Sequence, residues 1–188
     1  MALRPRNLVL PILLVLALLA LALSVPSAAE AASPCKTWGK TTPEKLRTGQ
    51  ARKAVLCLIN KQRDQAGLPA LDRNKKLQKA AQRHNERMDG TGCFSHECPG
   101  EAPLGTRLDG YLSGGLSAWG IGENVAWGGG ELGTPEAIVK AWMNSPGHRA
   151  NILSRDWREV GVGFSSGSPS SGNANAGIYT TDFGLRVG

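Results

Sequence analysis

Aromatic residues are scarce in this sequence: Phe, Trp and Tyr make up 5% of the 188 residues, beside three histidines and four cysteines. The cysteines lack the paired C-x-x-C spacing of a zinc cluster. No G-x-S-x-G elbow of a serine hydrolase occurs. Basic residues are not interleaved with aromatic ones, which argues against a nucleic-acid partner. The composition, with 41% apolar residues, also excludes collagen-like, coiled-coil and wholly disordered chains.

Charge is absent from residues 8–25, which are almost entirely apolar. Two arginines precede this run and the small residues of 27–32 follow it, as in a secretory signal peptide. We therefore predict a signal peptide over 1–31, cleaved after Ala29 or, by preference, after Ala31. An apolar run of this length is also near the lower limit for a membrane span, so an uncleaved anchor is the alternative. We expect a secreted, extracellular protein in an oxidising compartment.

Four cysteines allow three disulfide pairings, and the sequence alone does not choose among them. In a helix, Cys57 would point roughly 160° away from the apolar stripe. An N-terminal tail that carries Cys35 could cross the back of the helix there. Cys93 and Cys98 would close a tight loop around His96. Local geometry therefore favours the pairs Cys35–Cys57 and Cys93–Cys98.

Helix starts are marked by two Thr-Pro-Glu segments, in which Thr caps the helix, Pro takes the first helical position and Glu faces the positive helix end. They predict helices over 43–66 and 135–144. A third helix is predicted from near Asp72 or Asn74 to about Met88, because apolar residues recur there at helical spacing.

Strands are predicted near the end of the chain. Apolar residues alternate with glycine over 160–164, and 178–183 reads as the partner strand, with a solvated connection over 165–177. A short helical turn is expected over 149–153. The stretch 90–133 is glycine-rich and is predicted to be irregular and functional. Helices followed by a hairpin predict an α+β fold.

Four ordered motifs lie between the end of the third helix and the last strand. They are Phe94-Ser95-His96; the segment Gly-Ile-Gly-Glu-Asn-Val-Ala-Trp-Gly around Glu123; Ala-Trp-Met-Asn-Ser-Pro-Gly-His-Arg-Ala-Asn-Ile-Leu at 141–153; and Glu159-Val-Gly-Val-Gly with Tyr179-Thr-Thr-Asp-Phe-Gly. At this spacing they resemble the CAP superfamily (SCP domain) of cysteine-rich secretory, antigen 5 and pathogenesis-related 1 proteins, and its bacterial secreted branch above all. The resemblance covers about 52–184, and 32–50 is predicted to hold an N-terminal tail and the start of the first helix.

The resemblance implies a three-layer α-β-α sandwich with long irregular loops, and a cleft lined by two His and two Glu that binds a divalent metal in some members. Three of these positions match, at His96, Glu123 and His148. Where eukaryotic members carry the second Glu, this chain has Ser145, so the site is reduced. Asn124 is expected to orient the neighbouring carboxylate or to brace its loop.

Two neutral imidazoles and one carboxylate suit Zn²⁺ or another divalent metal, with one position left open for water. Such a water would be a nucleophile near neutral pH, and Glu159 is the nearest unassigned candidate for a general base. The alternative is that His96 and His148 hydrogen-bond within a buried polar cleft and hold Glu123. His84, the third histidine, is expected to be a packed core residue.

A basic stripe follows the third predicted helix, about 115° from its apolar face. It consists of Lys76, Lys79, Arg83 and Arg87. Such a stripe can meet anionic polymers or lipid head groups, and a solvated helix face explains it equally well.

The function we predict is that of a secreted binding or interaction module. Its His/Glu cleft would take a lipid, a sterol, a cell-envelope component or a host molecule. Contact with a membrane is expected only through the signal or an uncleaved anchor. The alternative function is that of a divalent-metal-dependent hydrolase that uses His96, Glu123 and His148.

Overall fold

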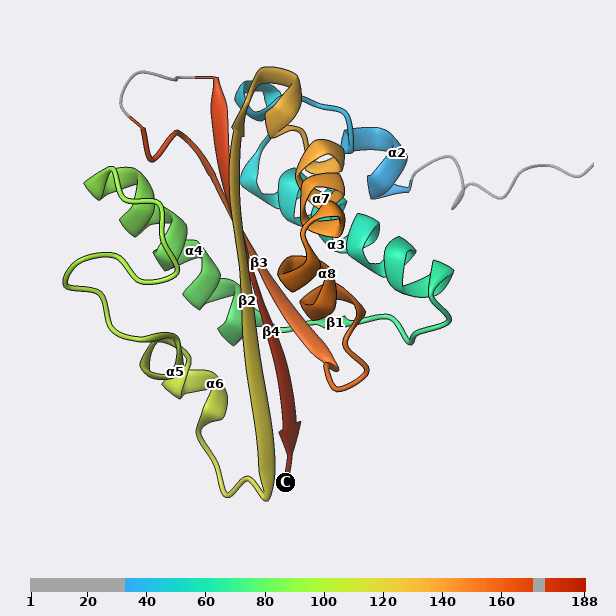
Figure 1. The fold of residues 1–188 in the computed structure, drawn as a ribbon, viewed down its shortest axis with the longest axis vertical. Coiled ribbons are helices and arrows are strands. Elements are labelled where there is room, and N and C mark those ends of the chain that lie inside the picture. Colours follow the sequence, from blue (N-terminus) through green and yellow to red (C-terminus); the bar gives the residue numbers. More distant parts are fainter. Residues whose placement is uncertain (1–32, 171–174) are drawn as a thin grey trace, which may run out of the picture.

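A four-stranded sheet lies between two helical layers in the computed structural model, which describes residues 33–170 and 175–188. Its elements are α2 (Pro34–Trp38), η1 (Pro43–Lys45), α3 (Thr48–Gln65), β1 (Asp72–Arg73), α4 (Lys75–Thr91), α5 (Leu104–Arg107), α6 (Asp109–Leu112), β2 (Ala118–Gly129), η2 (Gly130–Gly133), α7 (Pro135–Asn144), α8 (Pro146–Leu153), β3 (Glu159–Ser166) and β4 (Ala176–Val187). Helices α3, α7 and α8 cover one face of the sheet, and α4 covers the other (Figure 1). The predicted α+β class and α-β-α layering are confirmed, while the predicted signal peptide lies outside the described residues.

The strand order in the sheet is β1-β3-β4-β2. Strands β2 and β3 both pair antiparallel with β4, whereas β1 pairs parallel with the first two residues of β3. The prediction that 90–133 is irregular was wrong for 118–129, which form β2. Glycine at four of these twelve positions hid the strand pattern, and pairing with β4 along its whole length makes it a strand. The short β1 was not predicted either.

The predicted first helix is interrupted. After the 3₁₀ turn η1, Leu46 and Arg47 are extended, and α3 begins only at Thr48. Leu46 is buried in the core at this break, so burial of its side chain outweighs continuation of the helix. Of the two starts proposed for the next helix, Asn74 is the cap, because its side chain accepts hydrogen bonds from the first turn of α4.

Side chains of β3 divide the core between the two layers. Val160, Val162 and Phe164 are buried in the cluster that also contains residues of α3 and α7. Gly161 lies on the opposite face, where a Cβ would collide with the backbone of Leu77 and Gln78 in α4. Glycine at this position therefore allows the axis of α4 to lie close to the sheet.

Two disulfides fasten the periphery of the fold. Cys35–Cys57 ties α2 to α3, and Cys93–Cys98 closes the loop that follows α4. These are the pairs that local geometry favoured. None of the helices in the described ranges is long and apolar enough to span a membrane.

Candidate functional site

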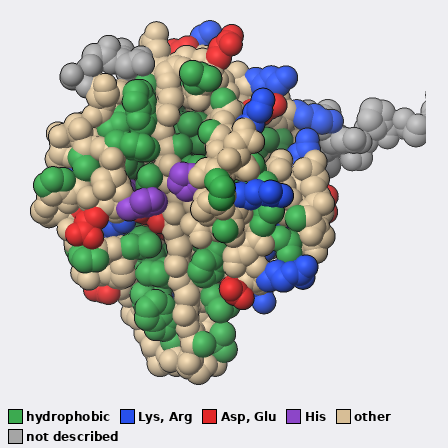
Figure 2. All heavy atoms as spheres, viewed as in Figure 1, with side chains coloured by type: hydrophobic (Ala, Val, Ile, Leu, Met, Phe, Trp, Pro, Cys, Tyr) green, Lys and Arg blue, Asp and Glu red, His purple; other side chains and the backbone are tan. Residues whose placement is uncertain are grey.

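The site lies along β2, which forms one edge of the sheet. Because successive strand residues point to opposite faces, Glu123 faces the α4 layer and Asn124 faces the α8 layer. Gly122 lets that second layer close over the strand, since a Cβ there would lie 3.0 Å from the Trp157 ring and 3.2 Å from the side-chain oxygen of Asn151. The edge strand thus contributes side chains to both layers. Figure 2, which views the molecule as in Figure 1, shows histidine side chains near the middle of the surface, with hydrophobic side chains around them.

Glu123 is the centre of the site. Its side chain is 2% exposed and contacts two cations. The Oε1 atom lies 2.8 Å from Nδ1 of His96, a hydrogen bond in which the ring nitrogen donates to the carboxylate. The Oε2 atom lies 2.9 Å from Nη2 of Arg107, and Nε2 of His84 is 3.9 Å away. Oε1 is therefore hydrogen-bonded to His96, whereas Oε2 lies in an ion pair with Arg107 without the geometry of a hydrogen bond.

A second set of contacts holds the disulfide loop that presents His96. Nδ1 of His84 lies 2.9 Å from the Glu101 carboxylate, and its Nε2 lies 3.0 Å from the carbonyl oxygen of Ser95. Arg107 donates to the carbonyl of His96 at 2.8 Å. His84 is fully buried, as expected of a core residue. It also connects α4 to the loop, which the sequence did not indicate.

On the other side of β2, Asn124 braces the segment that carries His148. Its Nδ2 donates to the carbonyl of His148 at 3.0 Å, and Nδ2 of Asn151 donates to its Oδ1 at 2.9 Å. Asn124 thus contacts the backbone near His148 rather than the Glu123 carboxylate. Ser145 lies at the junction of α7 and α8 and makes no side-chain capping bond.

The electrostatics of the site follow from these contacts. The hydrogen bond to Glu123 raises the pKa of His96. Burial alone would raise the pKa of Glu123, but the hydrogen bond from His96 and the charge of Arg107 outweigh it and lower that pKa. Burial, together with the charge of His96, lowers the pKa of His148. His96 thus favours the charged form and His148 the neutral one.

Asp182 is a further member of the site. It pairs with Glu123 across β2 and β4, is fully buried, and has no hydrogen-bond partner by distance and angle among the described residues. Burial first, and then the charge of Glu123, raises its pKa well above the ordinary value. Two carboxyl groups this close in the interior disfavour simultaneous ionisation.

The metal triad expected from the sequence does not fit this arrangement. Over residues 33–170 and 175–188, no three His, Cys, Asp or Glu side chains gather as metal ligands. The Nδ1 atom of His96 is used by Glu123, and the Arg107 guanidinium, already a cation, lies against the other carboxylate oxygen.

Glu159, the candidate for a general base, is held by other contacts. Its carboxylate accepts hydrogen bonds from Asn74 at 2.7 Å and Tyr111 at 2.9 Å, and it pairs with Arg186 at 3.3 Å. These contacts tie its carboxylate to the cap of α4, to α6 and to β4, and none of them involves His96, Glu123 or His148.

Four residues of the site were not predicted from the sequence to belong to it: His84, Glu101, Arg107 and Asp182. Glu101 and Arg107 lie in the glycine-rich stretch, where no periodicity places them. The position of Asp182 depends on the register between β2 and β4. Signals were present for His84, which follows helical spacing onto the inner face of α4, and for Asp182, which lies in the motif Tyr179-Thr-Thr-Asp-Phe-Gly.

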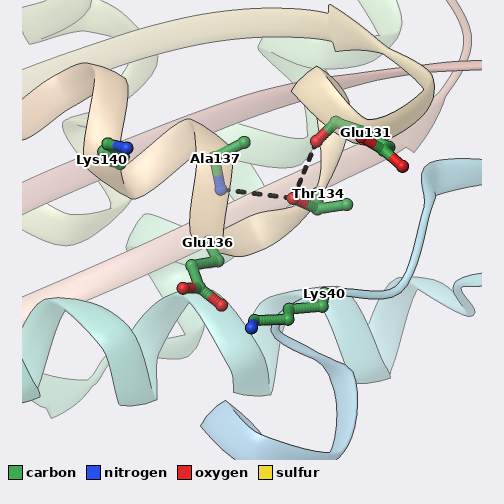
Figure 3. Close-up of a pocket in the computed structure, with 6 residues that line it drawn as sticks. All are labelled: Lys40, Glu131, Thr134, Glu136, Ala137 and Lys140. Atoms are coloured by element: carbon green, nitrogen blue, oxygen red, sulfur yellow. Dashed lines mark hydrogen bonds between the residues drawn. The ribbon is translucent and has the colours of Figure 1, made fainter.

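A hollow of about 390 Å³ lies away from these residues, between α7 and the segment after α2. Lys40 and Glu136 flank it (Figure 3), and Thr134 caps α7 beside it by accepting a hydrogen bond from the Ala137 N–H at 3.3 Å. Its charged lining consists of two lysines and two glutamates. This balance favours no class of ligand.

The fold and the order of the site residues can now be compared with known proteins. The model of the cysteine-rich secretory protein (CAP) family matches residues 56–183. The chain therefore belongs to the CAP family.

Among its relatives, the uncharacterized protein YkwD of Bacillus subtilis is 36% identical over 138 residues, which are 73% of this chain and 51% of YkwD. The uncharacterized membrane protein YlbC of the same organism is 32% identical over 120 residues, 64% of this chain and 33% of YlbC. The chain thus spans about half, or less, of the length of these curated relatives.

A solved extracellular protein with an SCP domain, from Bacillus anthracis, is similar with a TM-score of 0.59 and 27% identity, over 72% of this chain and 40% of that one. An outer surface protein from Borrelia burgdorferi has a TM-score of 0.62 at 20% identity, over 75% of this chain and 96% of that one. The second likeness concerns the fold alone.

Proposed function

We propose that this protein is secreted and acts as an extracellular binding module. Its ligand would lie across the β2 edge, between His96 and His148, and would be an amphipathic molecule such as a lipid, a sterol or a lipid-like component of the cell envelope. The extracellular SCP-domain protein from Bacillus anthracis supports the location.

The observation that carries this proposal is the internal pairing of Glu123. Because both of its oxygens face protein cations, the carboxylate is not free to act as a base or a metal ligand. The His96 imidazole, in contrast, is 58% exposed and is held in a fixed orientation. Such a group can hydrogen-bond the polar end of a ligand.

Exposed apolar side chains on the His96 loop and on the same side of β2 as Glu123 would supply the second half of an amphipathic site. Phe94 belongs to the same disulfide loop and is 47% exposed. Trp127 projects from the same side of β2 as Glu123 and is 36% exposed. Exposed aromatic groups beside a fixed polar group are typical of ligand and partner surfaces.

Binding can be tested on a panel of fatty acids, sterols and envelope lipids, by the change in intrinsic tryptophan fluorescence on titration. We expect Phe94→Ala and His96→Gln each to weaken the binding of lipid by about tenfold, since each removes one buried apolar or polar interaction with it. The matched control is Glu97→Gln, because Glu97 is an exposed neighbour whose side chain makes no hydrogen bond in the described chain.

The proposal fails if the panel gives no binding, or if a lipid binds and both Phe94→Ala and His96→Gln leave its affinity unchanged. An equal loss in the Glu97→Gln control would also contradict it, since that result would reflect the charge of the loop and not the site.

A further inference from the structure

A basic groove lies at the opposite edge of the sheet from His96. Two hollows of about 100 and 340 Å³ share Arg52 and Gln78 and thus form one groove between α3 and α4. Its cationic lining consists of Arg52, Lys53, Arg73, Lys75, Lys79 and Arg83. Among the described lining residues, Glu86 supplies the acidic charge. Cationic residues therefore outnumber acidic ones in the groove lining by much more than they do in the chain as a whole.

The structure divides the basic stripe that the sequence indicated. Lys79 and Arg83 line the groove, whereas Lys76 does not. Arg87 turns instead to the disulfide loop, where it donates to the carbonyl of Pro99. A uniformly solvated helix face does not explain this division, because only part of the stripe joins with cations from α3 and β1.

Arg52 is held in place at the centre of the groove. Its Nη2 donates to Oε1 of Gln82 at 2.7 Å, and the same oxygen accepts the backbone N–H of Phe164 in β3 at 3.1 Å. Its Nε is buried and has no hydrogen-bond partner in the part of the chain that the structure describes. Burial lowers the pKa of Arg52, and the charge of Arg73 lowers it further against the opposing effect of Glu86. An anion in the groove would relieve this repulsion by pairing with the guanidinium.

The spacing of the cations favours a chain of charges over a single anion. Lys75, Lys79 and Arg83 stand four residues apart, so they follow one another along α4 at about one turn, roughly 6 Å. Arg52 and Arg73 lie across from them on α3 and β1. An extended polymer with regularly repeated charges contacts several of these groups at once.

A membrane surface fits the groove less well. Phe94, Trp119, Trp127, Leu132 and Val187 are the large hydrophobic residues exposed in the described ranges. None of them lines the groove, whose apolar lining consists of the half-buried Leu56 and the buried Val162. Interfacial binding to lipid needs apolar side chains beside the basic ones.

We propose that this basic groove binds a linear anionic polymer of the poly(glycerol phosphate) kind, with repeated phosphate groups and no bases, laid along α4 between Lys75 and Arg83. The guanidinium groups of Arg52 and Arg73 would pair with phosphate oxygens from the opposite wall, since a guanidinium matches phosphate geometry with two donors. This site is separate from the proposed lipid site, because β3 and β2 lie on opposite sides of β4.

The test uses the chain without its predicted signal and a fluorescently labelled poly(glycerol phosphate), with binding followed by anisotropy over a range of salt concentrations. The variant Lys79→Gln/Arg83→Gln removes two charges from the groove. The variant Lys36→Gln/Lys76→Gln removes two exposed charges outside it and is the matched control. Circular dichroism confirms that both variants are folded.

We expect the groove variant to weaken binding by at least about tenfold and to reduce the slope of log K against log salt by about two, one for each phosphate that the groove no longer neutralises. The control should change affinity by less than about twofold. His96→Gln should leave polymer binding unchanged, so failure of the lipid proposal and failure of this one are distinguishable.

Three results would overturn the proposal. Equal losses in the two double variants would show that net charge alone drives binding. Inorganic phosphate that competes as well as the polymer, at equal phosphate concentration, would show a single-anion site. Binding to phosphatidylglycerol vesicles without binding to the polymer would assign the groove to a membrane surface.

Discussion

Replacing Glu123 with glutamine removes one buried negative charge while keeping the shape of the side chain. The charge lies 2.9 Å from Nη2 of Arg107, with side-chain exposures of 2% for Glu123 and 8% for Arg107. Breaking a buried ion pair costs about 3–5 kcal/mol, because the remaining charge is left uncompensated. Arg107 keeps a second carboxylate, that of Glu101, at 3.8 Å. We therefore expect the lower end of this range, about 3 kcal/mol.

His96 provides the contrast. It contacts the same carboxylate at 2.8 Å, but its side chain is 58% exposed. Solvent screens an interaction of this kind, so His96→Gln should cost no more than about 1 kcal/mol. The difference between Glu123→Gln and His96→Gln thus separates the buried half of the network from its exposed half.

Urea unfolding monitored by fluorescence measures both effects. With an unchanged m-value, Glu123→Gln should lower the midpoint by about 1–3 M and His96→Gln by less than about 1 M. In Glu123→Gln, the pKa of His96 in an NMR titration should fall, because the hydrogen bond that raises it is weakened. Glu97→Gln is the control and should leave stability unchanged. Equal losses in the first two variants, or a loss below about 1 kcal/mol in Glu123→Gln, would refute the reasoning.

Three more predictions concern stability. The raised pKa of Asp182 means that this group stabilises the fold fully below its unfolded-state pKa of about 4, and that the stabilisation is lost as the pH rises toward the folded-state pKa. Asp182→Asn should therefore raise the melting temperature at pH 7 but not at pH 3, and a loss at pH 7 would contradict this. Gly161→Ala should cost about 1–3 kcal/mol because the new methyl collides with the backbone of α4. Gly90→Ala, in open space within α4, should instead stabilise the protein by about 0.5–1 kcal/mol. Calorimetry would disprove the packing argument if the melting temperatures of both variants shifted in the same direction. Removing the disulfide Cys35–Cys57, with a sequence separation of 22 residues, should cost about 3 kcal/mol, and removing Cys93–Cys98, with a separation of 5, about 2 kcal/mol, because the longer loop restricts the unfolded chain more. If the urea midpoint fell further without Cys93–Cys98 than without Cys35–Cys57, this loop-entropy explanation would be rejected.

The parts of the fold that local chemistry determines were predictable. Thr134 caps α7 through its side chain, as its Thr-Pro-Glu segment indicates. The alternation of Val160, Val162 and Phe164 corresponds to buried positions of β3. The same Thr-Pro-Glu signal at Pro43 yields only a 3₁₀ turn, because Leu46, which follows it, is buried in the core. Local sequence signals for a helix fail where the burial of a neighbouring side chain determines the backbone conformation.

The site was predictable only in its motif residues. His96 and Glu123 do lie in contact, but Arg107, which pairs with the other carboxylate oxygen, comes from a segment with no helical or strand period longer than one turn. Its role follows from tertiary structure alone. The metal site expected from the motifs did not take account of this guanidinium, which lies 2.9 Å from the Glu123 carboxylate.

The edge position of β2 explains why one short segment of sequence serves two layers. Glu123 and Asn124 are adjacent, so their side chains leave opposite faces of the strand. Glu123 gathers the histidine loop and Arg107 on the α4 side, while Asn124 holds the backbone at His148 on the α8 side. In a central strand, residues at these positions would be covered by neighbouring strands along both edges, so the side chains that they hold would not be accessible to a ligand. The exposure of His96 and the half-burial of His148 therefore follow from where β2 lies in the sheet, and a ligand that bridges them would have to cross the one strand edge that the described chain leaves open beside them.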